Sequence, residues 1–174
     1  GTTIVGLLVC LERGIAHVAH VGDSRAYRVR EGRIELLTRD HSWVNEQIQN
    51  GVLSADQARN HPLRNVVTRA LGGKLELSVD MQVRKMEGGE MLLLCSDGLT
   101  TMVPDEDIKH LLDESKGDVD KAAQALVDEA NARGGEGSHN MRHPGRRQAD
   151  GQAQRTLRAP DANPTAEPHN NKAN

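Results

Sequence analysis

Short apolar runs separated by turn-forming residues occupy the first part of the chain, a pattern typical of β-strands. Such runs at 2–11, 15–21, 26–30 and 33–38 predict four strands, and Glu31-Gly32 predicts a tight hairpin turn between the last two. Because all the connections are short, we expect these strands to form an antiparallel meander.

The spacing of apolar residues becomes helical after the fourth strand. Ser42 is suited to cap a helix that ends at Gly51, and Ser54 with Gln57 forms the capping-box pattern of a second short helix. Residues 65–71 are ambiguous, although two valines favour extended structure. We therefore expect two small helices to interrupt the strands.

Strands and helices alternate in the rest of the patterned region. Residues 75–83 alternate apolar with polar side chains and predict a half-buried strand, whereas 91–95 is apolar on both faces and predicts a central strand. One helix is expected to start at Pro104, and another to cover 119–132 and stop at Gly134. This order of elements predicts an α+β fold with mainly antiparallel sheet.

Composition narrows the classes that remain. The 174 residues include one Trp, one Tyr and no Phe, so the core must be built from aliphatic side chains and Met. No run approaches the roughly 18 apolar residues that span a bilayer, and no secretory signal is visible, so we expect a cytoplasmic protein with no membrane contact. Cys10 and Cys95 lie in apolar runs and are expected to be buried thiols rather than a disulfide.

Residues 137–174 differ from the rest of the chain. They carry six basic and three acidic residues, a net charge of +3, and four of the six prolines. A segment with so few large apolar residues is predicted to be disordered, which places the end of the folded domain near residue 136. Because the segment has no aromatic residue for stacking on bases, we expect no nucleic-acid partner.

Two aspartates stand where predicted strands end. Asp23 lies in the turn Gly22-Asp23-Ser24, and Asp97 lies in Ser96-Asp97-Gly98. Carboxylates held on rigid backbone are the ligands that Mg²⁺ and Mn²⁺ prefer. Either aspartate alone is equally explained as an ordinary turn residue that bonds to its own backbone.

Taken in order, these motifs and their neighbours resemble the bacterial form of the PP2C (PPM) family of metal-dependent serine/threonine protein phosphatases. The resemblance covers about residues 1–136. The matching pieces are Gly1-Thr2-Thr3, Ala19-His20-Val21-Gly22-Asp23-Ser24-Arg25-Ala26-Tyr27, Leu37-Thr38-Arg39-Asp40-His41-Ser42, Asn65-Val66-Val67-Thr68-Arg69-Ala70-Leu71-Gly72 and Leu92-Leu93-Leu94-Cys95-Ser96-Asp97-Gly98-Leu99-Thr100.

The resemblance implies a PP2C-like antiparallel β-sandwich flanked by α-helices, and hydrolysis of phosphoserine or phosphothreonine in proteins. It implies Mg²⁺ or Mn²⁺ as cofactor, with a metal-held water as the attacking group. By resemblance, Asp97 would bind the central metal cluster and Asp23 a further, more weakly held metal. The segment at about 40–65 would be a flap beside the site, and the partners would be phosphorylated proteins, including substrates or regulators of a Ser/Thr kinase.

The family pattern is incomplete in this sequence. The N-terminal arginine and Asp-Gly pair of the family have no counterpart, and a Pro- and Arg-rich tail stands where an Asp-Asn pair would follow Gly134. A fragment that starts downstream of the family's beginning, and a reading-frame change or artificial junction after about residue 136, would explain both. Glu136 is the nearest acid, but nothing marks it as a replacement ligand.

These gaps lead to two expectations. The chain alone should bind metal poorly and show little activity, and it should expose sheet edges and an apolar face, with marginal stability or self-association as the result. A non-catalytic phosphoprotein-binding or regulatory module on the same scaffold is the alternative function.

Overall fold

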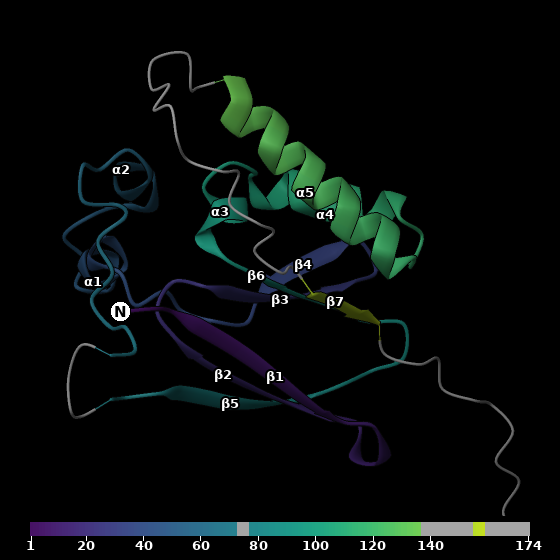
Figure 1. Cartoon of the computed structure of the whole chain (residues 1–174). Helices are drawn as coiled ribbons and strands as arrows, with labels where there is room; N and C mark the ends of the chain where they lie inside the picture. The colour runs from purple at the N-terminus through teal and green to yellow at the C-terminus, as the bar shows by residue number, and fades with distance from the viewer. Residues whose placement is uncertain (73–76, 137–154, 159–174) are drawn as a thin grey trace, which may run out of the picture.

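The computed structural model describes residues 1–72, 77–136 and 155–158, with side chains up to residue 134. Within these ranges, seven strands form two antiparallel sheets, and three helices cover the outer face of one of them (Figure 1). The strands are β1 (Ile4–Cys10), β2 (Ile15–Val21), β3 (Arg25–Arg30), β4 (Arg33–Leu36), β5 (Asp80–Lys85), β6 (Met91–Cys95) and β7 (Arg155–Arg158).

The helices are a 3-10 turn η1 (Leu11–Arg13), α1 (Trp43–Gln49), α2 (Ala55–Arg59), α3 (Asp97–Thr100), α4 (Asp105–Glu114) and α5 (Val119–Glu136). Helices α3, α4 and α5 lie over the four-stranded sheet, whereas α1 and α2 stand together at one end of the two sheets (Figure 1). The α+β class and the two-sheet arrangement expected from the sequence are confirmed.

The predicted four-strand meander is wrong at its centre. The strand orders are β1-β2-β5 in one sheet and β4-β3-β6-β7 in the other, so β2 and β3 do not pair. The turn between these strands contains Gly22 at φ +110°, a conformation that side chains disfavour, and it carries the chain from one sheet to the other. The turn that the sequence suggested between β2 and β3 is therefore a connection between the two sheets.

The hairpin predicted at Glu31-Gly32 is confirmed. β3 pairs with β4 in antiparallel register from Tyr27↔Leu36 to Arg30↔Arg33. Both turn residues have positive φ, 49° and 68°, as a two-residue turn between twisted strands requires.

Two layers of apolar side chains stabilise the molecule. Between the sheets lie side chains such as Val18, Ala26 and Leu92. The larger cluster lies between the four-stranded sheet and α3–α5, and includes Leu93 and Leu126, both fully buried. Strand β6 contributes to both layers on alternate residues, which confirms the central strand predicted at 91–95.

Strand β5 departs from the prediction for residues 75–83. The ladder begins only at Asp80, opposite His20, because β2 ends one residue later and offers no partner further on; residues 73–76 lie outside the described part. The apolar residues of this strand face solvent: Met81 and Val83 are 79% and 56% exposed, while Gln82 between them is half-buried and donates to the Leu37 carbonyl.

The outer face of the three-stranded sheet is consequently apolar and open. Besides the two exposed β5 side chains, β1 presents Ile4 and Leu8 at 50% and 65% exposure. The register places Leu8 and Val83 on either side of His17, so these side chains share one face. Within the described part of the chain, no helix lies over this face (Figure 1).

The helix boundaries are mostly as predicted. Ser42 accepts from the N–H of Asn45 at the start of α1, and both hydrogen bonds of the Ser54–Gln57 capping box are present. The stop expected at Gly134 is wrong, because α5 continues to Glu136. Arg133 stabilises this last stretch through bonds to Glu129 on the same helix and to Asp107 on α4.

Residues 65–71, which the sequence left ambiguous, form isolated bridges rather than a strand: Val67 pairs with Ser42, and Leu71 pairs with Thr2. Strand β7, at residues 155–158, pairs with β6 and lies inside the segment that was expected to be disordered. The rest of that segment lies outside the described residues.

No helix among the described residues is long and apolar enough to cross a membrane.

Both cysteines are free thiols in this fold. Cys95 is buried in the larger apolar cluster, and burial raises the pKa of its thiol to about 12. Cys10 is half-buried at the end of β1. The expectation of buried thiols is thus met fully at one position and partly at the other.

Candidate functional site

The loop that crosses between the sheets holds the first predicted site residue, Asp23. Position 22 requires glycine for steric reasons as well as for its positive φ, because an added Cβ would lie 2.3 Å from Cγ2 of Thr3. The Thr3 and Ser24 hydroxyls lie 2.9 Å apart and tie the far side of the loop to the N-terminal segment. Asp23 is therefore half-buried on tightly fixed backbone.

Asp97, the second predicted site residue, is brought close to Asp23 by the fold. It follows β6 directly and begins the short helix α3, which the sequence analysis did not predict. Burial and then the negative charge of Asp97 raise the pKa of Asp23, with a smaller contribution from Asp40. Two acids that are 74 positions apart in the sequence are thus close enough for the charge of one to affect the ionisation of the other.

Arg25, next to Asp23, is engaged by other groups. Its Nε and Nη2 donate to the Asp40 carboxylate at 2.9 and 2.7 Å, and its Nη1 donates to the Tyr27 hydroxyl at 3.0 Å. Tyr27 in turn donates to Asp105 at the start of α4. Burial opposes the charge, but the hydrogen bonds with Asp40 raise the pKa of Arg25. The guanidinium therefore links β3 to the loop that contains Asp40.

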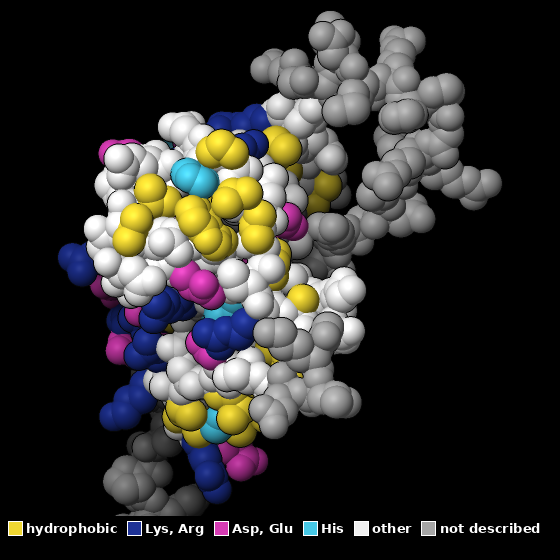
Figure 2. Space-filling view, turned by 90° about the vertical axis from the view of Figure 1, so that its left-hand side faces the viewer, with side chains coloured by type: hydrophobic (Ala, Val, Ile, Leu, Met, Phe, Trp, Pro, Cys, Tyr) yellow, Lys and Arg dark blue, Asp and Glu magenta, His cyan; other side chains and the backbone are white. Residues whose placement is uncertain are grey.

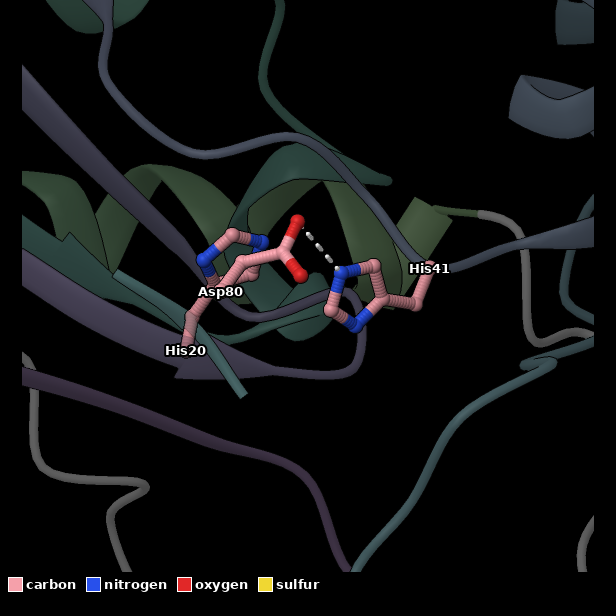
Figure 3. A group of neighbouring side chains, drawn as sticks. All are labelled: His20, His41 and Asp80. Atoms are coloured by element: carbon pink, nitrogen blue, oxygen red, sulfur yellow. Dashed lines mark ion pairs between the residues drawn. The ribbon is translucent and has the colours of Figure 1, made fainter. Parts of the chain in front are cut away.

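Two histidines and an acid form a second cluster beside the Asp23 loop, shown in Figure 3. His20 and His41 are 4% and 3% exposed, and their rings stack with centroids 4.7 Å apart. Nε2 of His41 lies 3.2 Å from Oδ2 of Asp80, and Arg69 donates to Oδ1 of the same carboxylate at 2.9 Å. Among the described residues, His20, His41 and Asp80 are a group whose ligand atoms lie close enough to hold a metal ion.

The sequence analysis found only parts of this cluster. Asp40-His41-Ser42 stood only inside one of the matching family pieces, and the structure gives its members separate roles: Asp40 binds Arg25, and Ser42 caps α1. Asp80 was hidden in an alternating strand pattern, where nothing marked it. It occupies a polar position of the alternation, like Ser78 and Gln82, so the pattern carried no signal for it.

The α1–α2 segment projects beside these residues. Figure 2 shows a gathering of hydrophobic side chains over it, with charged side chains below. Val52, Leu63 and Val66 are 64%, 42% and 42% exposed there. The segment is anchored where it leaves the sheets, since the N–H of Trp43 donates to the Val66 carbonyl at 2.9 Å.

Glu136, the remaining acid considered in the sequence, lies at the end of α5. Its side chain falls outside the described residues, so the structure assigns it no part in the site.

The fold and the paired acidic loops define an α+β sandwich with an acidic centre at one end of its sheets. The sequence profile of the family described as Protein phosphatase 2C matches residues 1–139. The chain belongs to this family, and the motifs quoted in the sequence analysis all lie inside the matched region.

Bacterial phosphatases are similar to this chain in sequence. It is 39% identical over 136 residues to the serine/threonine phosphatase stp of Listeria monocytogenes, covering 78% of this chain and 53% of that protein. It is 38% identical over 135 residues to the protein phosphatase PhpP of Streptococcus pneumoniae, covering 78% and 54%. The chain thus spans about half the length of the curated relatives it matches.

Solved structures agree with this relationship. The Mycobacterium tuberculosis serine/threonine phosphatase PstP/Ppp matches with a TM-score of 0.71 and 32% identity, over 76% of this chain and 55% of that one. A structure of the catalytic domain of PstP in complex with two manganese ions matches with a TM-score of 0.66 and 30% identity, over 76% and 53%. The PP2C-like fold expected from the sequence is confirmed, over about half of these larger domains.

Proposed function

We propose that this chain is part of a phosphatase that hydrolyses phosphoserine and phosphothreonine in proteins, with Asp97 and Asp23 as carboxylate ligands of Mg²⁺ or Mn²⁺. The observation that carries the proposal is that Asp23 and Asp97 follow strands β2 and β6 at one end of the sheets, where burial and the charge of Asp97 raise the pKa of Asp23. A divalent cation held by both acids would relieve that repulsion, and carboxylate oxygen is the donor that hard cations prefer. The donor set therefore fits the metal that the family implies.

The chain's own residues supply orientation. Asp23 is fixed by the crossing loop, and Asp97 is fixed by the junction of β6 with α3. When bound, the metal would activate water and neutralise charge that develops on the phosphoryl oxygens. We assign Arg25 a structural role rather than phosphate binding, because each of its three side-chain nitrogens donates to Asp40 or Tyr27.

Two carboxylates are few for a dinuclear centre of hard cations, which needs several oxygen ligands held together. The chain also spans only about half of its relatives, as one of them shows at 53% of its length. We therefore expect the chain by itself to bind metal weakly and to turn over little phosphopeptide. Addition of the rest of a family domain would be needed for full activity.

The proposal extends to organisation and partners. Residues 1–136 are the phosphatase-type domain, residues at about 40–65 are a flap, and 137–174 are a tail. The exposed apolar side chains on the flap, such as Val52 and Leu63, favour a role in contacting protein substrates. The substrates would be phosphorylated proteins in the cytoplasm that a Ser/Thr kinase has modified.

Mn²⁺ titration of the full 174-residue chain tests the site. We expect weak binding that Asp97→Asn and Asp23→Asn each reduce strongly, while Asp120→Asn on exposed α5 surface leaves it unchanged. The electron paramagnetic resonance signal of free Mn²⁺ measures the bound fraction. Equal binding by wild type and Asp97→Asn would overturn the assignment of these ligands.

Hydrolysis of a phosphothreonine peptide tests the reaction. We expect turnover far below that of a full-length relative such as the Listeria enzyme, and none in the presence of EDTA. Turnover equal to the relative would contradict the expectation of weak activity, and turnover that survives EDTA would contradict the metal mechanism. Tight peptide binding without any turnover would support the alternative, a phosphoprotein-binding module.

A further inference from the structure

His41 holds Gly22 from two sides. The backbone N–H of His41 donates to the Gly22 carbonyl at 2.9 Å, and the Gly22 N–H donates to His41 Nδ1 at 3.1 Å. Both residues are buried, so these bonds are not exchanged with water. One residue therefore satisfies both polar groups of the residue that immediately precedes Asp23.

The contact with Gly22 also determines which nitrogen of His41 carries the proton. Nδ1 accepts a hydrogen bond, so its lone pair faces the Gly22 N–H and the proton of the neutral ring is on Nε2. Burial lowers the pKa of His41, which favours this neutral ring. Nε2 faces the Asp80 carboxylate at 3.2 Å, a distance suited to donation, although the angles are poor and Nε2 has no well-formed hydrogen bond.

Neighbouring residues fix the plane of the His41 ring. His20 stacks against it at 4.7 Å, and His20 Nε2 donates to the Arg39 carbonyl at 2.7 Å, two residues before His41. Asp80 is held in turn by Arg69. Burial opposes ionisation of Asp80, but the adjacent His41 imidazole and the hydrogen bond from Arg69 lower the pKa of this acid and keep it charged.

A metal ion on this cluster is the competing explanation, and the proton positions oppose it. A neutral imidazole has one lone pair in its plane, and in His41 it is directed at the Gly22 N–H. Binding a metal through Nε2 would break that contact. The Arg69 guanidinium, 2.9 Å from Asp80, adds a positive charge where a cation would have to sit.

We propose that His41, oriented by Asp80 and His20, is a positioning residue that holds the Gly22-Asp23 backbone so that the Asp23 carboxylate faces Asp97. The inference rests on the proposed function, because it concerns the metal site proposed there. It also connects the end of the flap region with that site, through Arg69 and Asp80. Groups that orient metal ligands typically change metal affinity about 10- to 100-fold when removed.

Two amide substitutions separate the contact of His41 with Gly22 from its contact with Asp80. His41→Asn places an amide oxygen near the position of Nδ1 and keeps an acceptor for Gly22, whereas His41→Gln places an amide near Nε2 and keeps only the contact with Asp80. His110→Gln on the exposed face of α4 is the matched control. Asp80→Asn removes the charge of the orienting acid and leaves the His41 side chain itself unchanged.

The first measurement is free of metal: ¹⁵N shifts of the His41 ring, and the ¹³C shift of the Asp23 carboxyl, in the full chain. We expect the Nε2–H form in wild type, and a displaced Asp23 signal in His41→Gln that His41→Asn largely restores. A proton on Nδ1, or an Asp23 signal unchanged in both His41→Gln and Asp80→Asn, would overturn the inference. Failure of wild type to bind Mn²⁺ would count against the proposed function alone, since these shifts need no metal.

The second measurement is Mn²⁺ affinity alongside urea unfolding. We expect affinity about tenfold weaker in His41→Gln, a smaller loss in His41→Asn and Asp80→Asn, and no change in His110→Gln. If His41 had a merely structural role, its substitution would lower the urea midpoint without changing the Mn²⁺ affinity of the folded fraction. That result would contradict the positioning role. If His41→Gln does not fold, Asp80→Asn decides between the two outcomes.

Discussion

The two sheets of this molecule have the same antiparallel pairing and opposite surroundings. Helices α3, α4 and α5 cover the outer face of the four-stranded sheet, and side chains such as Leu93 there are fully buried. The outer face of the three-stranded sheet also carries apolar side chains, yet Leu8 and Met81 there are 65% and 79% exposed. Hydrophobic patterning alone therefore does not determine which face becomes core; a covering layer does.

The difference has a thermodynamic meaning. An apolar side chain contributes to the free energy of unfolding when folding removes it from water, by about 25 cal/mol for each Å². The four-stranded sheet gains this contribution on both faces, and the three-stranded sheet gains it only on the face that meets its partner. Substitutions should thus affect the two sheets very differently.

The largest contrast is expected between two leucines. Leu93→Ala on β6 should lower the free energy of unfolding by about 2–5 kcal/mol, because it leaves a cavity in a fully buried position. Leu8→Ala on β1 should change it by about 0.5 kcal/mol or less. Urea unfolding followed by circular dichroism measures both. Equal losses would show that the exposed face is covered in solution and would break the comparison.

The crossing between the sheets should be the next most sensitive point. Gly22→Ala places a Cβ 2.3 Å from Thr3 at φ +110°, and we expect a loss of about 2–4 kcal/mol from strain and overlap together. Gly32→Ala is the matched control, because its φ is also positive but nothing lies within 4 Å of the added Cβ. A loss of about 1 kcal/mol is expected there. Identical urea midpoints for the two variants would contradict the steric argument.

The smallest effect concerns a buried charge at the edge of the well-covered sheet. The side chain of Glu90 is fully buried, neither oxygen has a hydrogen-bond partner, and Arg28 and Arg30 lie 3.5 and 4.0 Å away. Burial outweighs these two arginines and raises the pKa of Glu90. The folded protein therefore binds a proton more readily than the unfolded chain does.

The sign of the pH dependence follows from that difference. A raised folded-state pKa makes Glu90 contribute stability as pH falls from the folded value towards the ordinary value of 4.5, and this contribution is lost as pH rises through the folded value. Glu90→Gln should flatten this dependence and raise the urea midpoint at pH 7, while Glu12→Gln on the exposed turn η1 should do neither. A lower midpoint for Glu90→Gln at pH 7 would show that the arginine contacts outweigh burial.

Local signals in the sequence predicted local structure well. The Ser54 capping box, the Glu31-Gly32 hairpin and the central strand at β6 depend on neighbouring residues, and all three are confirmed. The assignment of β2 and β3 to different sheets depends on how layers stack, and no local pattern contains that information. The outward direction of Met81 in β5 was missed for the same reason.

The candidate site divides in the same way. Asp23 and Asp97 could be identified because each follows a recognisable strand inside a family motif, and the structure brings them together. That they are metal ligands stays a prediction. The contact of His41 with Asp80 could not be foreseen, since it joins residues 39 positions apart through a strand pairing that only the fold creates.

The unequal burial of the two cysteines allows one natural position of the molecule to be labelled selectively. Cys95 has a pKa of about 12 and lies in the core, so thiol reagents will leave it untouched at neutral pH. Cys10, half-buried at the end of β1, can take a maleimide label without any engineered cysteine. A fluorophore attached there would sit on the sheet whose outer face is open, and its emission would report directly when another surface comes to cover that face.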